Sequence, residues 1–304
     1  PAEAGATDPQ QRLLPEQMYV TCAEAGLGKA TLFGRDVGVF LGIMNTDFAE
    51  LMRGSTSVYA ATGGTISIAA GRVSFVLGLM GPCCSVDTAC SSALAATHFS
   101  ALAVRFAECE EALACAVSLM LSPAMSACYS RAGMLSTDGR CKTFDARANG
   151  YVRGEGVGAL VIQPSVESAT PALETPGWVA TLASIGTQQD GRSASLTAPS
   201  GSAQLQLLRN TYGRASLTAG VLEAHGTGTP LGDPTELGAV CQAAPQGFTI
   251  AGVKASTGHL EPAAGMIGLL KLAASQRQAR VAANARMSKL NPEIQLGAMR
   301  GATS

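Results

Sequence analysis

Short apolar runs of strand length, separated by helix-length stretches, constrain the fold of this chain more than any other feature of its sequence. Val37–Ile43 (VGVFLGI) and Ala112–Leu121 (ALACAVSLML) contain no charged residue. A continuous apolar run of this length indicates a strand that is buried on both faces of its sheet. Ile66–Leu79 and Cys90–Val104 lie between these runs and have the length and spacing of helices. Strands that alternate with helices predict an α/β architecture around a largely buried sheet.

The same alternation continues to the end of the chain after a proline-rich break. Pro164–Gly177 contains Pro164, Pro171 and Pro176 and therefore predicts a surface linker. This linker predicts two halves with a similar order of elements, residues 1–165 and residues 166–304. Strands are expected at Val157–Ile162, Val179–Ile185, Val221–Ala224 and Phe248–Val253, and helices at Ser202–Tyr212, Pro234–Ala243 and Pro262–Gln278.

The composition argues against two classes of protein. Charged residues make up 14% of the chain, against about 25% in ordinary soluble domains, so we expect much of the surface to be covered by internal layers or a partner subunit. Lysine and arginine total 21 against 22 acidic residues, without a basic cluster, which argues against binding to nucleic acid. The longest apolar stretch, Ile66–Met80, contains Arg72 and is shorter than the roughly 18 residues of a membrane-spanning helix.

The cysteines indicate the compartment of the protein, and the start of the chain indicates whether it is part of a longer protein. Nine cysteines are present and none forms a CxxC pair, so neither a disulfide framework nor a zinc site is expected. Most of them fit buried positions in a reducing compartment, the cytoplasm or an organelle. The chain opens at Pro1 with no signal-peptide pattern, and we expect it to be a piece of a longer protein.

Cys90 has the sequence context of a nucleophile. It lies in SVDTACSSALAATHFS, where a short strand is expected to end and a helix to begin. The unpaired N–H groups at a helix N-terminus favour the thiolate form of a cysteine. Ala89, Ser91 and Ser92 are small and would allow close approach of a substrate. The alternative at this position is a buried, inert cysteine.

Two of the three histidines are candidate catalytic residues. His225 lies in EAHGTGTPLGDPTEL and His259 in VKASTGHLEPAAGM, and each is predicted to follow a strand. Loops after strands carry many functional groups in α/β proteins. With Cys90 they indicate a cysteine–histidine catalytic set, although an isolated loop histidine is more often structural. His98 lies on the apolar helix after Cys90 and is expected to be a core residue.

No metal or nucleotide site is predicted from these loops. A metal would need a third ligand at suitable spacing, and none stands near His225 or His259 in the sequence. Gly226, Gly228 and Gly232 fit neither the phosphate-loop pattern nor the dinucleotide fingerprint. We expect these glycines to permit tight turns and close approach of a substrate.

Three motifs, taken in order, resemble one family. DTACSS (Asp87–Ser92), EAHGTGTPLGDP (Glu223–Pro234) and VKASTGHLEPAAG (Val253–Gly265) together resemble the β-ketoacyl synthase (ketosynthase) domain of type I modular polyketide synthases. Three further stretches are similar to the same family and extend the resemblance over nearly the whole chain: DPQQRLLPEQ near the start, RAGMLSTDGRCKTFDA at Arg131–Ala146 and DGRSASLTAPSG at Asp190–Gly201.

The resemblance implies a fold and a reaction. The fold would be the thiolase-like α/β fold, with two similar halves stacked as α-β-α-β-α layers. The reaction would be a decarboxylative Claisen condensation of two acyl thioesters. Cys90 would carry the acyl chain as a thioester, while His225 and His259 would bind the carbonyl of a malonyl-type extender and stabilise its enolate.

The resemblance also implies supporting residues and partners. Lys254 would support His259, and the hydroxyls of Thr227 and Thr229 would hold the pantetheine arm of the extender. No cofactor would be bound directly, because the substrates are carried on the phosphopantetheine of an acyl carrier protein. Neighbouring synthase domains and a second copy of the chain, in a homodimer, are the other partners implied.

Some features depart from the family pattern. Ser256 stands where the family usually has Asn, but Lys254 and His259 keep their separation. The family's first strand would precede Pro1, and a glycine-rich segment would follow the NPEIQL stretch. We therefore expect a domain incomplete at both ends, with the complete domain active and this piece less stable and weakly active.

Three alternatives remain at this point. A fatty-acid synthase ketosynthase shares the motifs, and the GRCKTFDA and DGRS stretches favour the polyketide type. A thiolase-like enzyme or cysteine–histidine hydrolase would use one histidine as a base for Cys90. A non-catalytic partner subunit of the same fold would usually lack the nucleophilic cysteine.

Overall fold

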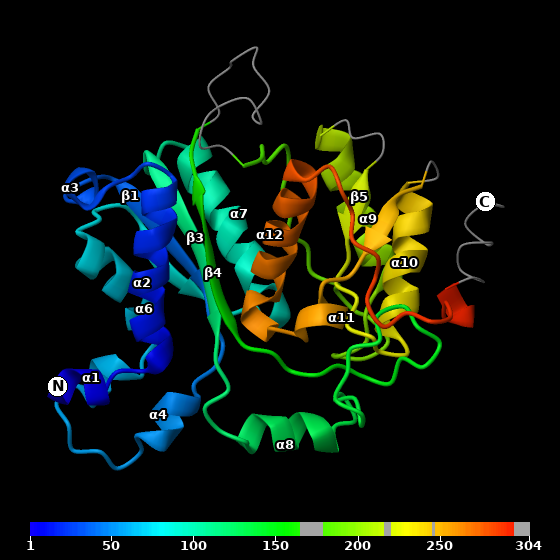
Figure 1. The fold of residues 1–304 in the computed structure, drawn as a ribbon, viewed down its shortest axis with the longest axis horizontal. Coiled ribbons are helices and arrows are strands. Elements are labelled where there is room, and N and C mark those ends of the chain that lie inside the picture. The colour runs from blue at the N-terminus through cyan, green and yellow to red at the C-terminus, as the bar shows by residue number, and fades with distance from the viewer. Residues whose placement is uncertain (165–178, 216–219, 245–246, 295–304) are drawn as a thin grey trace. The chain divides into compact units, whose positions relative to one another are not determined.

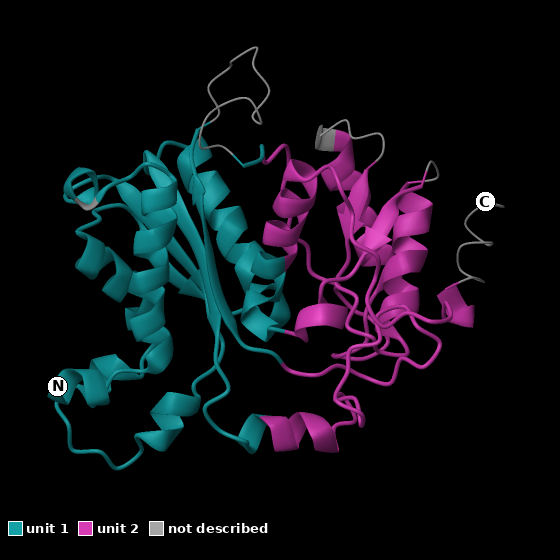
Figure 2. Ribbon diagram, viewed as in Figure 1, with its two compact units in different colours: residues 1–125, 154–181, 260–267 teal, residues 126–153, 182–259, 268–304 magenta. Residues whose placement is uncertain are grey.

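A computed structural model describes residues 1–164, 179–215, 220–244 and 247–294. The chain forms two compact units (Figure 2). Unit 1 comprises residues 1–125, 154–181 and 260–267, and unit 2 comprises residues 126–153, 182–259 and 268–304. The units group residues by contact, and the chain passes between them several times. The division into residues 1–165 and 166–304 stays a prediction, and the linker predicted at Pro164–Gly177 lies, after its first residue, outside the described residues.

Unit 1 is built on a four-stranded sheet. Its strands are β1 (Val37–Gly42), β2 (Cys83–Val86), β3 (Glu111–Ser118) and β4 (Gly156–Ile162), in the order β2-β1-β3-β4. β1 runs parallel to β2 and β3, and β4 runs antiparallel to β3. Every residue of β1 and β3 is buried, which confirms the strands predicted from the two apolar runs.

Helices cover both faces of this sheet (Figure 1). On one face α2 (Pro9–Glu24) and α6 (Ile66–Leu77) pack on Val39 and Leu41 of β1 in the main hydrophobic core. On the other face α7 (Ser92–Arg105) contacts β1 and β3, with Phe40 in a second cluster. Neighbouring residues of β1 therefore face opposite helix layers, as a strand buried on both sides requires.

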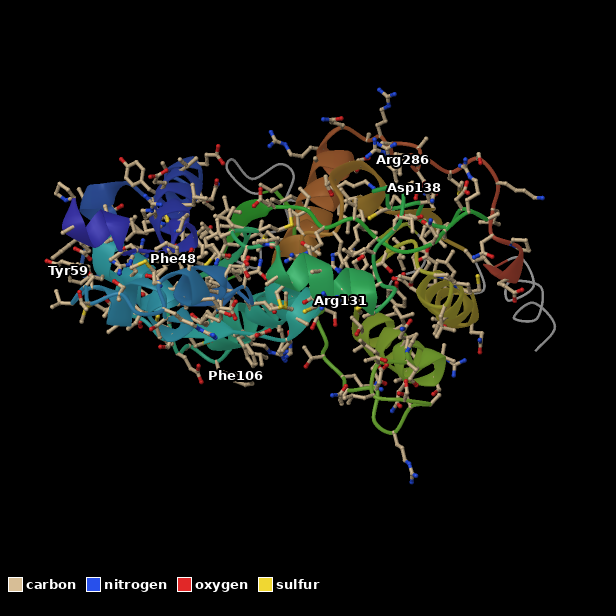
Figure 3. The ribbon with its side chains drawn as sticks, turned by 90° about the horizontal axis from the view of Figure 1, so that it is seen from below. Phe48, Tyr59, Phe106, Arg131, Asp138 and Arg286 are labelled. Carbon is tan, nitrogen blue, oxygen red and sulfur yellow. The ribbon has the colours of Figure 1, made fainter. Side chains whose placement is uncertain are left out.

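The remaining helices of unit 1 are short. They are α1 (Ala2–Gly5), α3 (Lys29–Leu32), α4 (Asp47–Leu51), α5 (Ala60–Gly63) and the 3-10 turns η1 (Ala89–Ser91) and η3 (Glu261–Ala263). Large apolar side chains remain exposed on this unit, among them Phe75 at 87%, Phe106 at 68% and Tyr59 at 39% of their surface. Figure 3 labels Tyr59 and Phe106.

Unit 2 contains a smaller sheet of two parallel strands, β5 (Val221–Glu223) and β6 (Thr249–Ala251). Its helices are α9 (Gly201–Ala215), α10 (Gly232–Ala243) and α11 (Lys254–Thr257). Two further helices, α8 (Ala124–Arg131) and α12 (Ala264–Arg277), begin in unit 1 and end in unit 2. The strands and helices predicted for this region are confirmed apart from one strand.

The strand predicted at Val179–Ile185 is wrong. The structure assigns no strand to residues 179–190, and Val179 and Leu182 are 41% and 45% exposed. An apolar pattern can make a segment suitable for a sheet, but a strand forms only where a neighbour completes its backbone hydrogen bonds. None of the helices within the described ranges is long and apolar enough to cross a membrane.

Candidate active site

Cys90 lies in the turn between β2 and α7, in the order of strand, turn and helix predicted from the sequence. The residue is half-buried in the middle of the 3-10 turn η1, two residues before α7 begins at Ser92. Ala89 has a φ of +52°, a left-handed conformation that residues other than glycine seldom adopt. Strain of this kind is concentrated at functional sites, where the surrounding structure holds it.

Side-chain oxygens hold this turn in place. The Ser92 hydroxyl accepts the Thr88 N–H at 2.9 Å and donates to the Ala89 carbonyl at 2.7 Å. The Asp87 carboxylate accepts the Ala89 N–H at 3.0 Å, and the Ser91 hydroxyl donates to the Thr88 carbonyl at 2.8 Å. Hydrogen bonds on both sides of Cys90 therefore fix the backbone that carries its sulfur.

Gly42 brings β1 close to the start of α7. A Cβ atom at this glycine would lie 2.7 Å from both the Ala93 nitrogen and the Ser92 carbonyl carbon. Real Cβ atoms do not approach backbone atoms so closely, so only glycine permits this packing. It places the Cys90 turn beyond the carboxyl ends of parallel strands, the usual location of functional sites in α/β folds.

The two predicted histidines lie together in unit 2. The ring centroids of His225 and His259 are 5.3 Å apart and the rings are nearly perpendicular. Tyr151 contacts the His259 ring edge-on, at 5.0 Å between centroids. The backbone N–H of His259 donates to the Val152 carbonyl at 2.7 Å. His225 follows β5, as predicted, whereas His259 follows the short helix α11 rather than a strand.

Lys254 and burial set the charge state of these rings. Lys254 begins α11 and is 4% exposed. Burial lowers the pKa of His259 well below its usual value, and the Lys254 cation lowers it further. The pKa of His225 is also lowered, first by loss of hydration and then by Lys254. His225 keeps an exposed face, which moderates this shift without reversing it, so both imidazoles are neutral at pH 7.

Two carboxylates of α10, the buried Asp233 and the half-buried Glu236, anchor the loop that carries His225. Glu236 accepts the N–H groups of His225 and Gly226 at 2.5 and 2.9 Å. Asp233 accepts the N–H groups of Phe144 and Gly228 at 2.8 and 3.0 Å. Burial raises the pKa of each carboxyl group, and these N–H donors oppose the rise. The sequence analysis did not identify Asp233 or Glu236 as site residues. Acidic residues at the start of a predicted helix shortly after His225 could have indicated them, because carboxylates are favoured near helix N-termini.

A third carboxylate anchors the loop that carries Lys254. Glu223 in β5 accepts the Val253 N–H and pairs with the Nζ of Lys271 at 2.7 Å. The side chain of Glu223 is 4% exposed. It therefore ties the end of β5 to the residue before Lys254 and to α12.

Thr227 and Thr229 lie side by side in the glycine-rich loop after His225. Their hydroxyl oxygens are 3.2 Å apart, and the Thr229 hydroxyl accepts the Gly232 N–H at 3.2 Å. Thr227 is 8% exposed. The loop thus presents two adjacent hydroxyls beside the histidine pair.

The predicted site residues are divided between the units. Cys90 belongs to unit 1, and the two histidines, Lys254 and the two threonines belong to unit 2. Within unit 2 the structure brings together the residues that the sequence motifs singled out. The approach of Cys90 to the histidines stays a prediction. His98 is half-buried on α7, with Phe99 beside its ring.

The chain matches two models of one protein family. The model described as the N-terminal domain of β-ketoacyl synthase matches residues 1–168. The model described as the C-terminal domain of β-ketoacyl synthase matches residues 179–288. Together the two models cover most of both units and all six predicted site residues.

Similar proteins include polyketide synthases from two bacteria. The chain is 38% identical to one of the phenolphthiocerol/phthiocerol polyketide synthase proteins of Mycobacterium tuberculosis, over 99% of this chain and 14% of that protein. It is 39% identical to the spectinabilin polyketide synthase system protein NorA' of Streptomyces orinoci, over 97% of this chain and 8% of that protein. The chain therefore spans a small part of the length of these relatives.

Two solved structures are similar to the chain over most of its length. One is the ketosynthase from module 6 of the bacillaene synthase of Bacillus subtilis, with a TM-score of 0.87 and 34% identity. The other is the oxazolomycin ketosynthase domain OzmH KS7 of Streptomyces albus, with a TM-score of 0.89 and 32% identity. The matches cover 96% and 98% of this chain and 53% of each ketosynthase.

Proposed function

Because this chain belongs to the β-ketoacyl synthase family and has its α/β, thiolase-like fold, we propose that it is a condensing enzyme domain of polyketide chain elongation. Its relatives are polyketide synthases, which favours the polyketide type over the fatty-acid type. The reaction is a decarboxylative Claisen condensation between an acyl thioester and a malonyl-type thioester.

In the first half-reaction Cys90 accepts the acyl chain. The thiolate attacks the carbonyl carbon of the incoming thioester, a new carbon–sulfur bond forms, and the phosphopantetheine thiol of the carrier leaves. The position of Cys90 before the N-terminus of the 14-residue helix α7 supports this role, because the helix dipole stabilises negative charge there.

In the second half-reaction the extender loses carbon dioxide. The electron pair of the broken carbon–carbon bond forms an enolate whose oxygen carries the negative charge. The enolate carbon attacks the Cys90 thioester, a carbon–carbon bond forms, and the Cys90 thiolate leaves. The product is a β-ketoacyl thioester on the carrier.

His225 and His259 stabilise that enolate by donating N–H hydrogen bonds to the thioester oxygen. Donors that already point at the position of developing charge lower the barrier most. The lowered pKa of each ring supports this role, because a neutral imidazole retains an N–H donor and can bind beside Lys254. Lys254 acts through the histidines, and the adjacent hydroxyls of Thr227 and Thr229 hold the pantetheine arm.

The observation that carries this proposal is the pair of histidine rings, 5.3 Å apart on separately anchored loops. A cysteine hydrolase needs one histidine as a base for its thiol, and its mechanism leaves the second ring without a role. A non-catalytic partner subunit needs neither the cysteine nor the pair.

The partners follow from the same chemistry. An acyl carrier protein brings both thioesters on its phosphopantetheine, and neighbouring synthase domains process the product. We also propose a homodimer. β2 stands at the edge of its sheet, and Cys83 and Cys84 in this strand and Phe75 in α6 are exposed. An edge strand flanked by apolar side chains favours pairing with a second copy, and analytical ultracentrifugation tests it.

Acylation of the chain tests the nucleophile. After incubation with an acyl-pantetheine thioester, intact mass and peptide mapping should locate one acyl group on Cys90. Cys90→Ala should abolish the adduct, and Cys128→Ala, which removes an exposed thiol on α8, should leave it unchanged. An adduct that survives Cys90→Ala would refute the role of this residue.

Decarboxylation of malonyl-pantetheine then tests the histidines separately. His225→Ala and His259→Ala should each slow the release of carbon dioxide while Cys90 is still acylated. Hydrolysis of the acyl-Cys90 thioester, without decarboxylation of malonyl-pantetheine, would instead assign the chain to the hydrolase class.

A further inference from the structure

Two glycines of unit 2, on different loops, lie against the same side chain. Gly226 directly follows His225, and Gly252 stands two residues before Lys254. A Cβ atom added to either glycine would lie 2.6 Å from the Cγ2 methyl of Thr143. Carbon atoms that are not bonded do not approach so closely, so this methyl occupies the space that a side chain at either position would need. One methyl group therefore contacts both loops.

The orientation of the Thr143 side chain is fixed. Thr143 is completely buried, and its hydroxyl donates to the Gly226 carbonyl at 2.6 Å. Its carbonyl accepts the Nδ2 of Asn284 at 2.9 Å. Because the hydrogen bond of the hydroxyl selects one rotamer, the direction of the methyl is determined as well.

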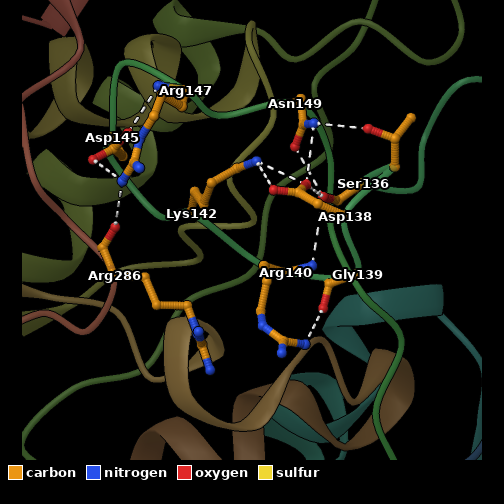
Figure 4. A network of polar contacts seen from close by, with 10 residues as sticks. Ser136, Asp138, Gly139, Arg140, Lys142, Asp145, Arg147, Asn149 and Arg286 are labelled. Carbon is orange, nitrogen blue, oxygen red and sulfur yellow. Dashed lines mark hydrogen bonds and ion pairs between the residues drawn. The ribbon is translucent and has the colours of Figure 1, made fainter.

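Ion pairs hold the chain on both sides of Thr143 (Figure 4). The Lys142 Nζ contacts both carboxylate oxygens of Asp138 at 2.8 Å, and the Nε of Arg147 donates to Asp145 at 2.7 Å. Asp145 is completely buried. The backbone that carries Thr143 is therefore anchored independently of the two loops that its methyl contacts.

The same segment also fixes His259. The Val152 carbonyl accepts the backbone N–H of His259 at 2.7 Å, nine residues after Thr143. All of these contacts lie within unit 2. His259 is therefore held relative to this segment, and the position of His225 relative to it depends on the contact between Thr143 and Gly226.

We propose that Thr143 is a positioning residue whose methyl group sets the separation of the loops that carry His225 and Lys254, and thereby the geometry of the two imidazole rings. This inference rests on the proposed function and adds a residue that acts through the histidines. The ring centroids are 5.3 Å apart, and two donors that meet one developing charge tolerate little displacement. The effect should fall on decarboxylation and spare acylation of Cys90.

An exchange of size between Thr143 and Gly252 tests the inference. Thr143→Ser removes the methyl and keeps the hydroxyl, and kcat for decarboxylation of malonyl-pantetheine should fall about tenfold with little change in KM. Gly252→Ala should also lower kcat, because its added carbon collides with the methyl. In Thr143→Ser/Gly252→Ala the added carbon replaces the missing methyl, and kcat should return to within about twofold of the wild type.

Two matched variants serve as controls. Gly226 has the same 2.6 Å approach but a φ of +48°, so a side chain there is strained even where space exists. Thr143→Ser/Gly226→Ala should therefore not recover. Thr211→Ser removes a methyl on α9 and keeps a hydroxyl that donates to the Leu207 carbonyl at 2.8 Å, and it should leave kcat unchanged.

NMR of the histidine rings distinguishes positioning from a general loss of stability. The chain has three histidines, so single substitutions assign their Cε1–H signals. Thr143→Ser should shift the signals of His225 and His259 and leave that of His98, in unit 1, unchanged. The double variant with Gly252→Ala should return both signals toward their wild-type positions.

Three results would overturn the inference. They are wild-type ring signals and kcat in Thr143→Ser, a Thr143→Ser/Gly252→Ala variant no faster than the slower single variant, and equal slowing of decarboxylation and of Cys90 acylation by acyl-pantetheine. If circular dichroism shows that the double variant is unfolded, the ring signals and kcat of Thr143→Ser decide. A wild type that does not decarboxylate malonyl-pantetheine would refute the proposed function, and the ring signals would still test the positioning by Thr143.

Discussion

The Cys90 turn in unit 1 and the histidine loops in unit 2 are held by different means. Hydroxyls and a carboxylate from within one short segment, Asp87–Ser92, fix the cysteine turn. Carboxylates on other elements fix the histidine loops, as the buried Asp233 and the half-buried Glu236 of α10 do for the segment after β5. The turn is therefore a local structure, whereas the histidine loops depend on buried charge supplied from elsewhere in the chain.

The largest expected loss of stability comes from removing a buried carboxylate of unit 2. Asp233→Ala leaves the N–H groups of Phe144 and Gly228 without their acceptor, and each unsatisfied buried group costs about 1–3 kcal/mol. We expect the free energy of unfolding, measured with urea, to fall by about 3 kcal/mol. Asp233→Asn keeps one acceptor and should lose less. Equal losses for the two variants would show that the carboxylate oxygens do not anchor the loop.

The next effect is on the packing beneath the cysteine turn. Gly42→Ala forces the first turn of α7 away from β1, and overpacking of this kind costs about 1–3 kcal/mol. Acylation of Cys90 should slow because the turn moves with the helix. Gly71→Ala, inside α6 with nothing within 4 Å of the added carbon, should instead stabilise unit 1 by about 0.5–1 kcal/mol. If both substitutions change the free energy of unfolding in the same direction, the close approach of β1 and α7 at Gly42 does not require glycine.

The pH dependence of stability should come from the histidine loops of unit 2. The unfolded chain binds a proton on His259 near its ordinary pKa of 6.5, but the folded chain does so only at lower pH. The free energy of unfolding should therefore be constant above pH 6.5 and fall below it, by at most about 1.4 kcal/mol per pH unit for this residue.

His259→Gln should make the decline shallower and leave the part that comes from His225, whose pKa is lowered as well. Lys254→Met should also reduce the loss of stability at low pH, because removal of the cation raises the pKa of the folded histidines. Urea unfolding at pH 5, 6, 7 and 8 measures both changes. A wild-type profile without a decline between pH 6.5 and pH 5 would contradict the buried, neutral state of His259.

The smallest effect is expected at the hydroxyl that closes the cysteine turn. Ser92→Ala removes the acceptor of the Thr88 N–H and the donor to the Ala89 carbonyl, at a cost of about 1 kcal/mol. The rate of Cys90 acylation, measured by rapid quenching and intact mass, should fall several-fold. Ser202→Ala, which changes an exposed serine of α9, provides the control and should leave the rate unchanged.

Prediction from sequence succeeded where the signal was local. The two apolar runs became the fully buried strands β1 and β3, because burial on both faces demands uninterrupted apolar residues. The strand predicted at Val179–Ile185 failed, because strand formation depends on a partner that a single segment does not specify. The motifs around Cys90, His225 and His259 identified the candidate residues, and the pairing of the two rings became visible only in the fold.

The sequence by itself determined the α/β alternation, the turn that carries Cys90 and the family to which the chain belongs, since each depends on neighbouring residues. Only the tertiary structure decided which carboxylates anchor the histidine loops and that Thr143 contacts the glycines of two loops. Electrostatic partners are chosen by distance in space and by loss of hydration, and neither leaves a periodic pattern along the chain.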